Sequence, residues 1–491
     1  MRRNGEPDRI VVVGGGISGL SSAFYLLREA KRRGLDIRVT IVETMDRVGG
    51  KINTLHRDGF VIERGPDSFL ARKKPIIDLA LELGIEQQLT GTNPAAKKTY
   101  ILHRRKLHSM PQGLVLGIPT EIAQFAKTRL LTFGAKMRAM LDFVKPARKA
   151  DGDESLGNFL SRRLGREVME RVAEPLLAGI YAGDLNTLSL QATFPQFGAA
   201  ERKHGSLIRG MRANKGKTPA IAANASELPS SARTAFLTFK GGLATMVNAL
   251  ERSLAADGTE FKLGAKVVGI EKVAEPDSGF EEQCGYRVLL DCGEAIEANG
   301  VVITTPAFHA ASLLEPYVNV DAISAVNYVS VANVVMAFDR ATLGYQFDGS
   351  GFVIPRSEGT TITACTWTSS KWLHSAPDDK VLLRCYVGRA GEEAVVDLPD
   401  EQLKEAVRAD IRSIMGITAE PLFTEITRLH QSMPQYPVGH LERTAQLRGE
   451  MAKTLPGVWV TGAAFDGVGL PDCIRQGKEA ASSLLDATRV T

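Results

Sequence analysis

The sequence of 491 residues predicts a protein of the α/β and α+β classes, in which one chain forms an α/β domain, a mixed α/β domain and an inserted, mainly helical domain. Three observations predict this fold class. An apolar strand near the N-terminus breaks into a glycine-rich turn and a helix, and a second unit of this kind stands near the C-terminal end. Strand patterns nearly vanish between residues 114 and 225, where helical periodicity dominates, and they return after residue 235.

The N-terminal unit reads RIVVVGGGISG and has the spacing Gly14-x-Gly16-x-x-Gly19. Gly14 permits a tight turn, Gly16 lets the backbone approach a pyrophosphate, and Gly19 lets the helix pack close to the strand. The helix should begin near Ser18 and point free N–H groups at the phosphates. Glu43 closes the next strand, RVTIVE, where it can accept a hydrogen bond from an unphosphorylated ribose. The unit predicts a Rossmann-like domain that binds FAD or NAD rather than NADP.

A basic residue and a glycine pair follow this second strand, as Arg47-Val-Gly49-Gly50. In flavoproteins of the two-dinucleotide-binding type, the chain folds back here over the FAD pyrophosphate. Arg47 can neutralise phosphate charge, and Gly49 and Gly50 allow close backbone approach. The alternative is a solvated turn with an incidental arginine. Because an NAD dehydrogenase does not need this stretch, we predict FAD as the cofactor.

Composition excludes several other functions. The net charge of +4 gives no global field that would attract nucleic acid. No apolar run reaches the roughly 18 residues that span a bilayer, and the N-terminal MRRNGEPDR lacks the apolar core of a signal peptide. The five cysteines form no CxxC and no metal-ligand spacing. We therefore expect reduced thiols, no metal site and a cytoplasmic location.

The elements between the two terminal units follow from their local patterns. ERGPDSFLARKKPIIDLALELG predicts a loop followed by an amphipathic helix, and residues 99–109 predict a short hairpin. Residues 214–231 are small and polar and predict a loop, and EPDSGFEEQCG predicts a hairpin tip. Strands are expected at residues 235–242, Phe261–Lys272, Tyr286–Asp291 and Gly300–Thr304, before a mixed region at 307–430.

The C-terminal unit VWVTGAAFDGVGLPDCIRQGKEAASSLL repeats the order of strand, glycine-rich turn and helix. In FAD enzymes of this class, such a helix N-terminus approaches the pyrimidine edge of the flavin. Backbone N–H groups at Val468, Gly469 and Leu470 could there stabilise negative charge on the reduced flavin. The alternative is an ordinary strand-to-helix turn without a ligand.

Several motifs along the whole chain resemble one family. The motifs are GGGISGL, ETMDRVGGK, FVIERGPDSFLARKK, EPLLAGIYAGD, LSLQATFPQF, SVANVVMAF, ITACTW, SMPQYPVGH and GVGLPDCIRQGK. They are similar to those of the bacterial coproporphyrinogen III and protoporphyrinogen IX oxidases, which are FAD enzymes of porphyrin and haem synthesis. The matches extend in register from about residue 10 to residue 480, and ERGPDSF and GVGLPDC discriminate best. The loosest fit lies at residues 214–231.

The resemblance implies a set of FAD-binding positions. The glycine-rich turn would hold the pyrophosphate, Glu43 the adenosine ribose, and Arg47 would lie beside the phosphates. Residues 65–68 would pass next to the flavin ring, Val267 would contact the adenine side, and the C-terminal turn would close over the isoalloxazine. The full set is Gly14, Gly15, Gly16, Ile17, Ser18, Gly19, Glu43, Thr44, Arg47, Gly49, Gly50, Lys51, Gly65, Pro66, Asp67, Ser68, Val267, Gly462, Ala463, Val468, Gly469 and Leu470.

The resemblance also implies a substrate and a reaction. Lys73, Gly179 and Ile180 resemble porphyrin-contacting positions. The expected activity is the six-electron oxidation of coproporphyrinogen III to coproporphyrin III in three steps, with oxygen as acceptor and hydrogen peroxide as product. Protoporphyrinogen IX is the alternative substrate, and a downstream ferrochelatase is a candidate partner. A flavin amine oxidase and a flavin-binding scaffold without turnover stay open as more distant alternatives.

The sequence allows two roles for Lys73 and two for the helical region. Lys73 could bind a propionate of the substrate, or it could be one of three solvated charges in the run Arg72-Lys73-Lys74. Residues 113–150 carry seven basic and two acidic side chains beside apolar residues at helical spacing: Ile122, Phe125, Leu130, Phe133, Met137 and Leu141. Such a face could contact an anionic membrane peripherally, or its apolar side could pack inside the domain.

The expected domains follow from these patterns. An FAD-binding domain takes residues 1–95, 232–306 and 431–491, and a substrate-binding domain takes residues 96–106 and 307–430. The helical domain, with its candidate membrane contact, takes residues 107–231.

Overall fold

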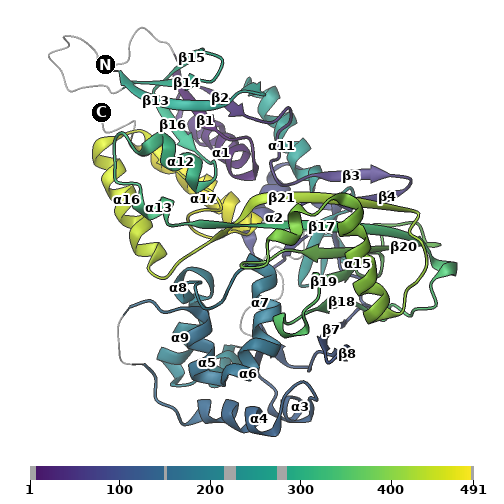
Figure 1. Cartoon of the computed structure of the whole chain (residues 1–491). Helices are drawn as coiled ribbons and strands as arrows, with labels where there is room; N and C mark the ends of the chain where they lie inside the picture. The colour runs from purple at the N-terminus through teal and green to yellow at the C-terminus, as the bar shows by residue number, and fades with distance from the viewer. Residues whose placement is uncertain (1–6, 149–151, 215–227, 274–284, 488–491) are drawn as a thin grey trace.

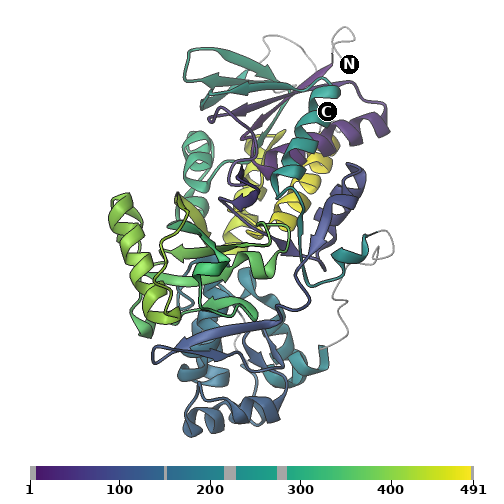
Figure 2. The same cartoon turned by 90° about the vertical axis from the view of Figure 1, so that its right-hand side faces the viewer.

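The computed structural model describes residues 7–148, 152–214, 228–273 and 285–487. The expected hairpin tip and most of the expected loop at 214–231 lie outside these residues. Figures 1 and 2 show a parallel sheet with its helices at one end of the molecule and a group of helices at the other. A large antiparallel sheet lies between them, beside the helix α15. This arrangement confirms the predicted fold class.

The parallel sheet has five strands in the order β12-β2-β1-β16-β22. Its strands come from both ends of the chain and from its middle: β1 (Asp8–Val13), β2 (Ile37–Glu43), β12 (Glu260–Leu263), β16 (Gly300–Ile303) and β22 (Val458–Val460). The apolar runs IVVV and VVI are buried on both faces, as expected for parallel strands between layers. The helices α1 (Ile17–Arg33), α11 (Ala244–Ala256) and α17 (Leu470–Ala487) pack together on one side, and α1 and α17 are the predicted helices of the two terminal units.

One expected strand is two strands in the structure. The prediction of a single strand over Phe261–Lys272 was wrong, because the chain bends at Gly264, which has a left-handed φ of 67°. Before the bend, β12 pairs with β2 in the parallel sheet. After it, β13 (Val267–Val273) starts a three-stranded antiparallel sheet with β14 (Gly285–Leu290) and β15 (Ala295–Ala298).

The large antiparallel sheet has seven strands in the order β21-β17-β20-β19-β18-β7-β8, of which β7 and β18 pair in parallel. The strands are β7 (Lys98–His103), β8 (Lys106–Ser109), β17 (Asn327–Asp339), β18 (Gly349–Val353), β19 (Ile362–Trp367), β20 (Lys380–Val387) and β21 (Phe423–Gln435). The first two form the predicted hairpin. The helix α15 (Asp400–Met415) buries Leu403, Val407 and Ile411 against the sheet.

Residues 122–214 form the helical end of the molecule. The helices are α3 (Ile122–Lys127), α4 (Phe133–Met140), α5 (Leu156–Leu164), α6 (Arg166–Val168), α7 (Glu174–Tyr181), α8 (Leu190–Thr193), α9 (Pro195–His204) and α10 (Leu207–Asn214). A π-helical turn, Met169–Ala173, joins α6 to α7. The core of this region includes Phe159, Phe197 and Tyr436, of which the last comes from the C-terminal part of the chain.

Smaller elements connect these three parts. They are the pair β3 (Thr54–Arg57) and β4 (Phe60–Glu63), the sheet of β5 (Phe69–Leu70), β11 (Phe236–Phe239) and β6 (Leu89–Gly91), the pair β9 (Leu114–Val115) and β10 (Ile118–Pro119), and the helices α2 (Lys74–Glu82), α12 (Ala307–Leu314), α13 (Asp321–Ser324), α14 (Thr368–Lys371) and α16 (His440–Thr454). The predicted helix after LARKK is α2. The division into three domains stays a proposal, and β8 and β21 each cross one of its boundaries.

Candidate active site

The glycine-rich turn has the geometry that its spacing predicts. Gly14 has a φ of 107°, and a Cβ atom on Gly19 would lie 1.9 Å from the carbonyl oxygen of Gly14. Gly19 is therefore needed for the close packing of α1 on β1. A Cβ on Gly16 would meet no protein atom within 4 Å, and Gly16 is the N-cap of α1 without a side-chain cap among the described residues. This uncapped helix N-terminus beside open space fits a pyrophosphate.

Glu43 lies directly behind this turn. Its carboxylate accepts hydrogen bonds from the backbone N–H of Gly15 at 2.7 Å and of Met45 at 2.9 Å, and from the hydroxyl of Thr44 at 3.1 Å. The carbonyl of Glu43 accepts a hydrogen bond from Ala265, two residues before Val267. The structure thus brings the expected ribose and adenine positions to one side of the turn.

The second glycine stretch packs on the first. Gly49 donates its N–H to the carbonyl of Gly15 at 2.8 Å, and a Cβ on Gly50 would lie 3.2 Å from the Cα of Gly16. The guanidinium of Arg47 donates to the carbonyls of residues 48, 50 and 52 and so braces this turn from within. Lys51 donates to the carbonyl of Ser432 at the far end of β21. These contacts support the proposed FAD cradle, in which Arg47 orders the turn.

The C-terminal turn meets the N-terminus of α1. A Cβ on Gly462 would lie 3.3 Å from the Oγ of Ser18, and a Cβ on Gly477 would lie 2.7 Å from the Oγ of Ser21. The hydroxyl of Tyr436 donates to the carbonyl of Ala463 at 2.6 Å and accepts the N–H of Gly467 at 3.1 Å. These two hydrogen bonds of Tyr436 therefore fix the turn that precedes α17. Leu470 packs on the core of the nucleotide-binding end, and Val468 packs on the core of the helical end.

The loop 65–68 lies on the face of the seven-stranded sheet. A Cβ on Gly65 would lie 1.7 Å from the carbonyl oxygen of Lys51, so this position requires glycine. The buried Arg384 donates to the carbonyl of Gly65, and Asn333 donates to that of Arg64 at 3.0 Å. Asp67 accepts the hydroxyl of Ser68 at 2.7 Å. Burial opposes ionisation of Asp67, but the charges of Lys371 and Arg384 outweigh it and hold the pKa of this carboxyl below its usual range.

Lys73 differs from the two basic residues beside it. Its Nζ lies 2.5 Å and 2.7 Å from the two carboxylate oxygens of Asp472 in the first turn of α17, whereas Arg72 and Lys74 are exposed. Lys73 therefore has a carboxylate partner although its side chain stays 38% exposed, and its contact with a propionate stays a prediction. Asp472 also raises the pKa of Tyr181 at the end of α7, although burial of this phenol contributes more. The candidate substrate positions on α7 thus lie near the turn that carries Lys73 and Asp472.

The two α7 positions face open space. Ile180 is 45% exposed although it is apolar, and a Cβ on Gly179 would meet no protein atom within 4 Å. A cavity of about 750 Å³ lies among the segment that follows α7, the helix α12, the start of β17 and the end of β21, but its lining residues include no predicted site residue. Among the described residues no group of side chains could hold a metal ion, and the four described cysteines are free.

The sequence analysis missed several residues that shape this site, among them Asn333, Arg384, Tyr436 and Asp472. Two of them carried a usable signal. Asn333 and Arg384 are polar residues inside the apolar runs VANVVMAF of β17 and VLLRCYV of β20, and such residues need a buried partner. Tyr436 and Asp472 gave no such signal, because their partners are known only from the fold.

The amphipathic face of the helical end is partly buried and partly exposed. Phe125 and Leu130 are buried and Ile122 is partly buried, whereas Phe133, Met137 and Leu141 are 79%, 53% and 51% exposed. Internal packing therefore holds only for the first half of the stretch. Two of its basic residues also point inward: Arg138 and Lys145 donate to carbonyls at the C-terminal end of α5. Lys149 lies outside the described residues.

Comparison with known proteins identifies the family of the chain. The model of the family "Flavin containing amine oxidoreductase" matches residues 17–485. The chain is 45% identical to the coproporphyrinogen III oxidase of Bacillus subtilis over 97% of both chains, and 39% identical to that of Staphylococcus aureus over 97% of this chain and 98% of the relative. It is 30% identical to the chloroplastic protoporphyrinogen oxidase of Nicotiana tabacum, over 96% of this chain and 85% of that protein.

Solved structures of related proteins show the same fold. A protein of Exiguobacterium sp. 255-15, provisionally assigned as a protoporphyrinogen oxidase, superposes with a TM-score of 0.83 at 36% identity, covering 98% of this chain and 99% of that chain. A putrescine oxidase shares the fold, with a TM-score of 0.66 at 16% identity and the same coverage. The chain therefore belongs to the flavin-containing amine oxidoreductase family, whose cofactor here is FAD, and within it to the group of the coproporphyrinogen III and protoporphyrinogen oxidases.

Proposed function

We propose that this protein oxidises coproporphyrinogen III to coproporphyrin III with FAD and molecular oxygen. The observation that carries the proposal is the position of Lys73, whose ammonium group pairs with Asp472 in the first turn of α17 while its side chain stays 38% exposed. A cation at this place suits a substrate with four propionates. The names of the bacterial relatives support the same substrate.

Different residues of the chain would bind the cofactor and the substrate. The glycine turns around Gly16 and Gly50 would hold the pyrophosphate of FAD, and Glu43 the ribose. When bound, FAD supplies the two-electron acceptor and passes the electrons on to oxygen. Lys73 would orient the substrate through a propionate, and the exposed Ile180 would contact the apolar macrocycle.

The reaction requires little else of the protein. Each of three rounds removes two electrons and two protons from the substrate. One oxygen molecule accepts these two electrons and two protons and becomes hydrogen peroxide. The product is aromatic, so the oxidation is strongly downhill and requires no strong nucleophile. This agrees with a site built from glycines, backbone groups and a few charges.

The assay that tests the proposal follows porphyrin fluorescence in air with coproporphyrinogen III and protoporphyrinogen IX in parallel, corrected for oxidation without enzyme. Several-fold faster turnover of coproporphyrinogen III supports the proposal. Preference for protoporphyrinogen IX would assign the alternative reaction, which the names of the plant and Exiguobacterium proteins favour. If neither is oxidised while putrescine or another amine yields peroxide, the chain is an amine oxidase. Bound FAD without any turnover would indicate a scaffold.

We also propose that the helical end contacts a membrane surface peripherally. The supporting observation is a row of exposed apolar side chains at helical spacing on and after α4: Phe133, Met137, Leu141 and Val144. Among the described residues no helix is long and apolar enough to span a bilayer. Binding to lipid vesicles tests this second proposal.

A further inference from the structure

A small polar cavity lies beneath the loop 65–68. Its volume is about 20 Å³, and a cavity needs only about 10–15 Å³ by this measure to hold one water molecule. Its polar lining comes from five parts of the chain: Glu63 at the end of β4, Asp67 in the loop, Thr238 on β11, Arg384 on β20, and the stretch from Thr368 to Ser375 with Trp372 and His374. Apolar side chains such as Ile62, Val335 and Leu382 close the remaining walls.

Arg384 is the group that requires a partner in this cavity. Arg384 is only 4% exposed, and one of its terminal guanidinium nitrogens donates to the carbonyl of Gly65. Its Nε and its other terminal nitrogen are buried and have no hydrogen-bond partner among the described residues, and the same is true of the indole Nε1 of Trp372. Buried N–H groups without partners are costly, and that cost is greatest for a charged group. A single water in the cavity would accept hydrogen bonds from two of these three N–H groups.

Glu63 is the acid on the other side of the cavity. Its carboxylate accepts the N–H of Leu243 at 2.6 Å and the hydroxyl of Thr54 at 3.0 Å. Burial raises the pKa of Glu63 to about 7, although these two hydrogen bonds and the charge of Arg384 act in the opposite direction. Asp67, by contrast, stays ionised because Lys371 and Arg384 lie beside it. The two acids of one cavity thus differ, because Asp67 stays ionised at neutral pH whereas Glu63 gains and loses its proton near neutral pH.

We propose that one ordered water occupies this cavity and bonds to Arg384, and that Glu63 takes up and returns a proton through it as the neighbouring FAD gains and loses electrons. The inference rests on the proposed position of residues 65–68 beside the flavin. Glu63 acts through the water and is therefore a positioning residue. The charged and titratable groups around it are Asp67, Lys240, Lys371, His374 and Arg384.

The proton balance of the proposed reaction gives such a group a role. Each round removes two electrons and two protons from the substrate, and the cofactor can store both electrons but only one of the hydrogens at neutral pH. The second proton passes to the carboxylate of Glu63. It is returned when oxygen accepts two electrons and two protons to form hydrogen peroxide, so that no proton is lost from the cycle.

A redox titration of the purified, FAD-loaded protein tests this without any porphyrinogen. We expect the fall of the two-electron potential of FAD with pH to become about twice as steep above about pH 7, because reduction then draws a second proton onto Glu63. Glu63→Gln should keep the shallower slope above about pH 7. Glu425→Gln is the matched control, since Glu425 lies on β21 and pairs with Arg57 and Arg64 outside the cavity. It should retain the break.

Two results would overturn the inference. One is a break that persists unchanged in Glu63→Gln, and the other is a wild-type titration with a single slope. If Glu63→Gln does not retain FAD, a high-resolution crystal structure of the wild type decides, since density for a water bonded to Arg384 is expected and its absence contradicts the proposal. A failure of porphyrinogen turnover in air would count against the proposed function alone, because the titration involves no substrate.

Discussion

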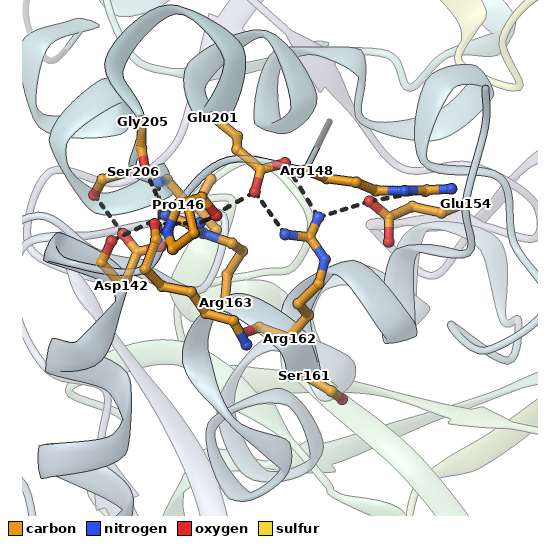
Figure 3. A network of polar contacts seen from close by, with 12 residues as sticks. Asp142, Pro146, Arg148, Glu154, Ser161, Arg162, Arg163, Glu201, Gly205 and Ser206 are labelled. Carbon is orange, nitrogen blue, oxygen red and sulfur yellow. Dashed lines mark hydrogen bonds and ion pairs between the residues drawn. The ribbon is translucent and has the colours of Figure 1, made fainter. Parts of the chain in front are cut away.

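Asp142 and Arg163 form an ion pair in which both side chains are completely buried, with 2.5 Å between Asp142 Oδ1 and Arg163 Nε. Figure 3 shows this pair beside a second one between Arg162 and Glu201. Asp142 also accepts the hydroxyl of Ser206 at 2.5 Å and the backbone N–H of Ile208 at 2.8 Å, so that it caps α10 from a distant part of the chain. The pair fastens the segment with exposed Leu141 and Val144 to the helical core.

Asp142→Asn should loosen this end of the protein strongly, because it removes the nearer of the two carboxylates that face the buried guanidinium of Arg163 and leaves only Glu201 at 3.1 Å. Loss of one partner of a buried pair costs about 3–5 kcal/mol. We expect amide hydrogen exchange in α10 to become faster by at least about a hundredfold, while β1 and α1 remain protected. Arg166→Ala, which breaks the exposed pair of Arg166 with Glu170, is the control and should leave exchange unchanged. Unchanged protection of α10 in Asp142→Asn would contradict the account.

Elements formed by residues that are close in sequence could be predicted, whereas contacts between residues that are far apart in sequence could not. The β1–α1–β2 unit, the hairpin of β7 and β8 and the helix α17 follow from periodicity and glycine spacing within about 30 residues. The ion pair of Asp142 with Arg163 and the bond of Lys73 to Asp472 join residues that are 21 and 399 positions apart. Side-chain type alone does not determine such partners, because only the packed fold brings them together.

Gly16→Ala tests the FAD cradle separately from the fold. A Cβ at this position meets no protein atom within 4 Å, so the protein without cofactor should unfold at the wild-type temperature. The methyl group would instead occupy the space proposed for the pyrophosphate. We expect FAD to bind at least about tenfold more weakly, which corresponds to ~1.4 kcal/mol, as measured by fluorescence titration of the apoprotein.

Gly449→Ala is the matched control for this change. Gly449 lies inside α16, where a Cβ also meets no atom within 4 Å, and alanine there should stabilise the helix slightly. Its FAD affinity should equal that of the wild type. If Gly16→Ala binds FAD as tightly as Gly449→Ala, the proposed path of the pyrophosphate is wrong.

Lys73→Ala should affect substrate binding more than turnover. Removal of the ammonium group deprives a propionate of its cationic partner, so KM for coproporphyrinogen III should rise about tenfold while kcat and FAD content stay close to wild type. Lys74→Ala removes the exposed neighbouring charge at the start of α2 and should leave both constants unchanged. Steady-state fluorescence assays at several substrate concentrations separate KM from kcat. Equal KM values for the two variants would exclude Lys73 as the propionate partner.

Glu63→Gln should change how stability depends on pH. The pKa of Glu63 rises from about 4.5 in the unfolded chain to about 7 in the fold, so the folded state binds more protons than the unfolded state between these values. Wild-type stability should therefore fall relative to the variant as the pH rises from about 4.5 to 7, and the difference should then stay constant. Thermal unfolding at about pH 5 and pH 8 measures this, with Glu425→Gln expected to follow the wild type. A difference that does not vary with pH would place the pKa of Glu63 at its ordinary value.

Membrane contact should depend on the exposed apolar row at the helical end. Phe133 and Val144 are 79% and 77% exposed, and insertion of such side chains into the headgroup region contributes favourable burial. Replacing both by serine should lower the fraction of protein that sediments with anionic lipid vesicles several-fold without loss of porphyrinogen turnover. Leu422→Ser removes a 50% exposed apolar residue next to β21 and should not change sedimentation. Equal sedimentation of the two variants, or no wild-type binding at low ionic strength, would assign the row to a protein partner or a second copy of the chain.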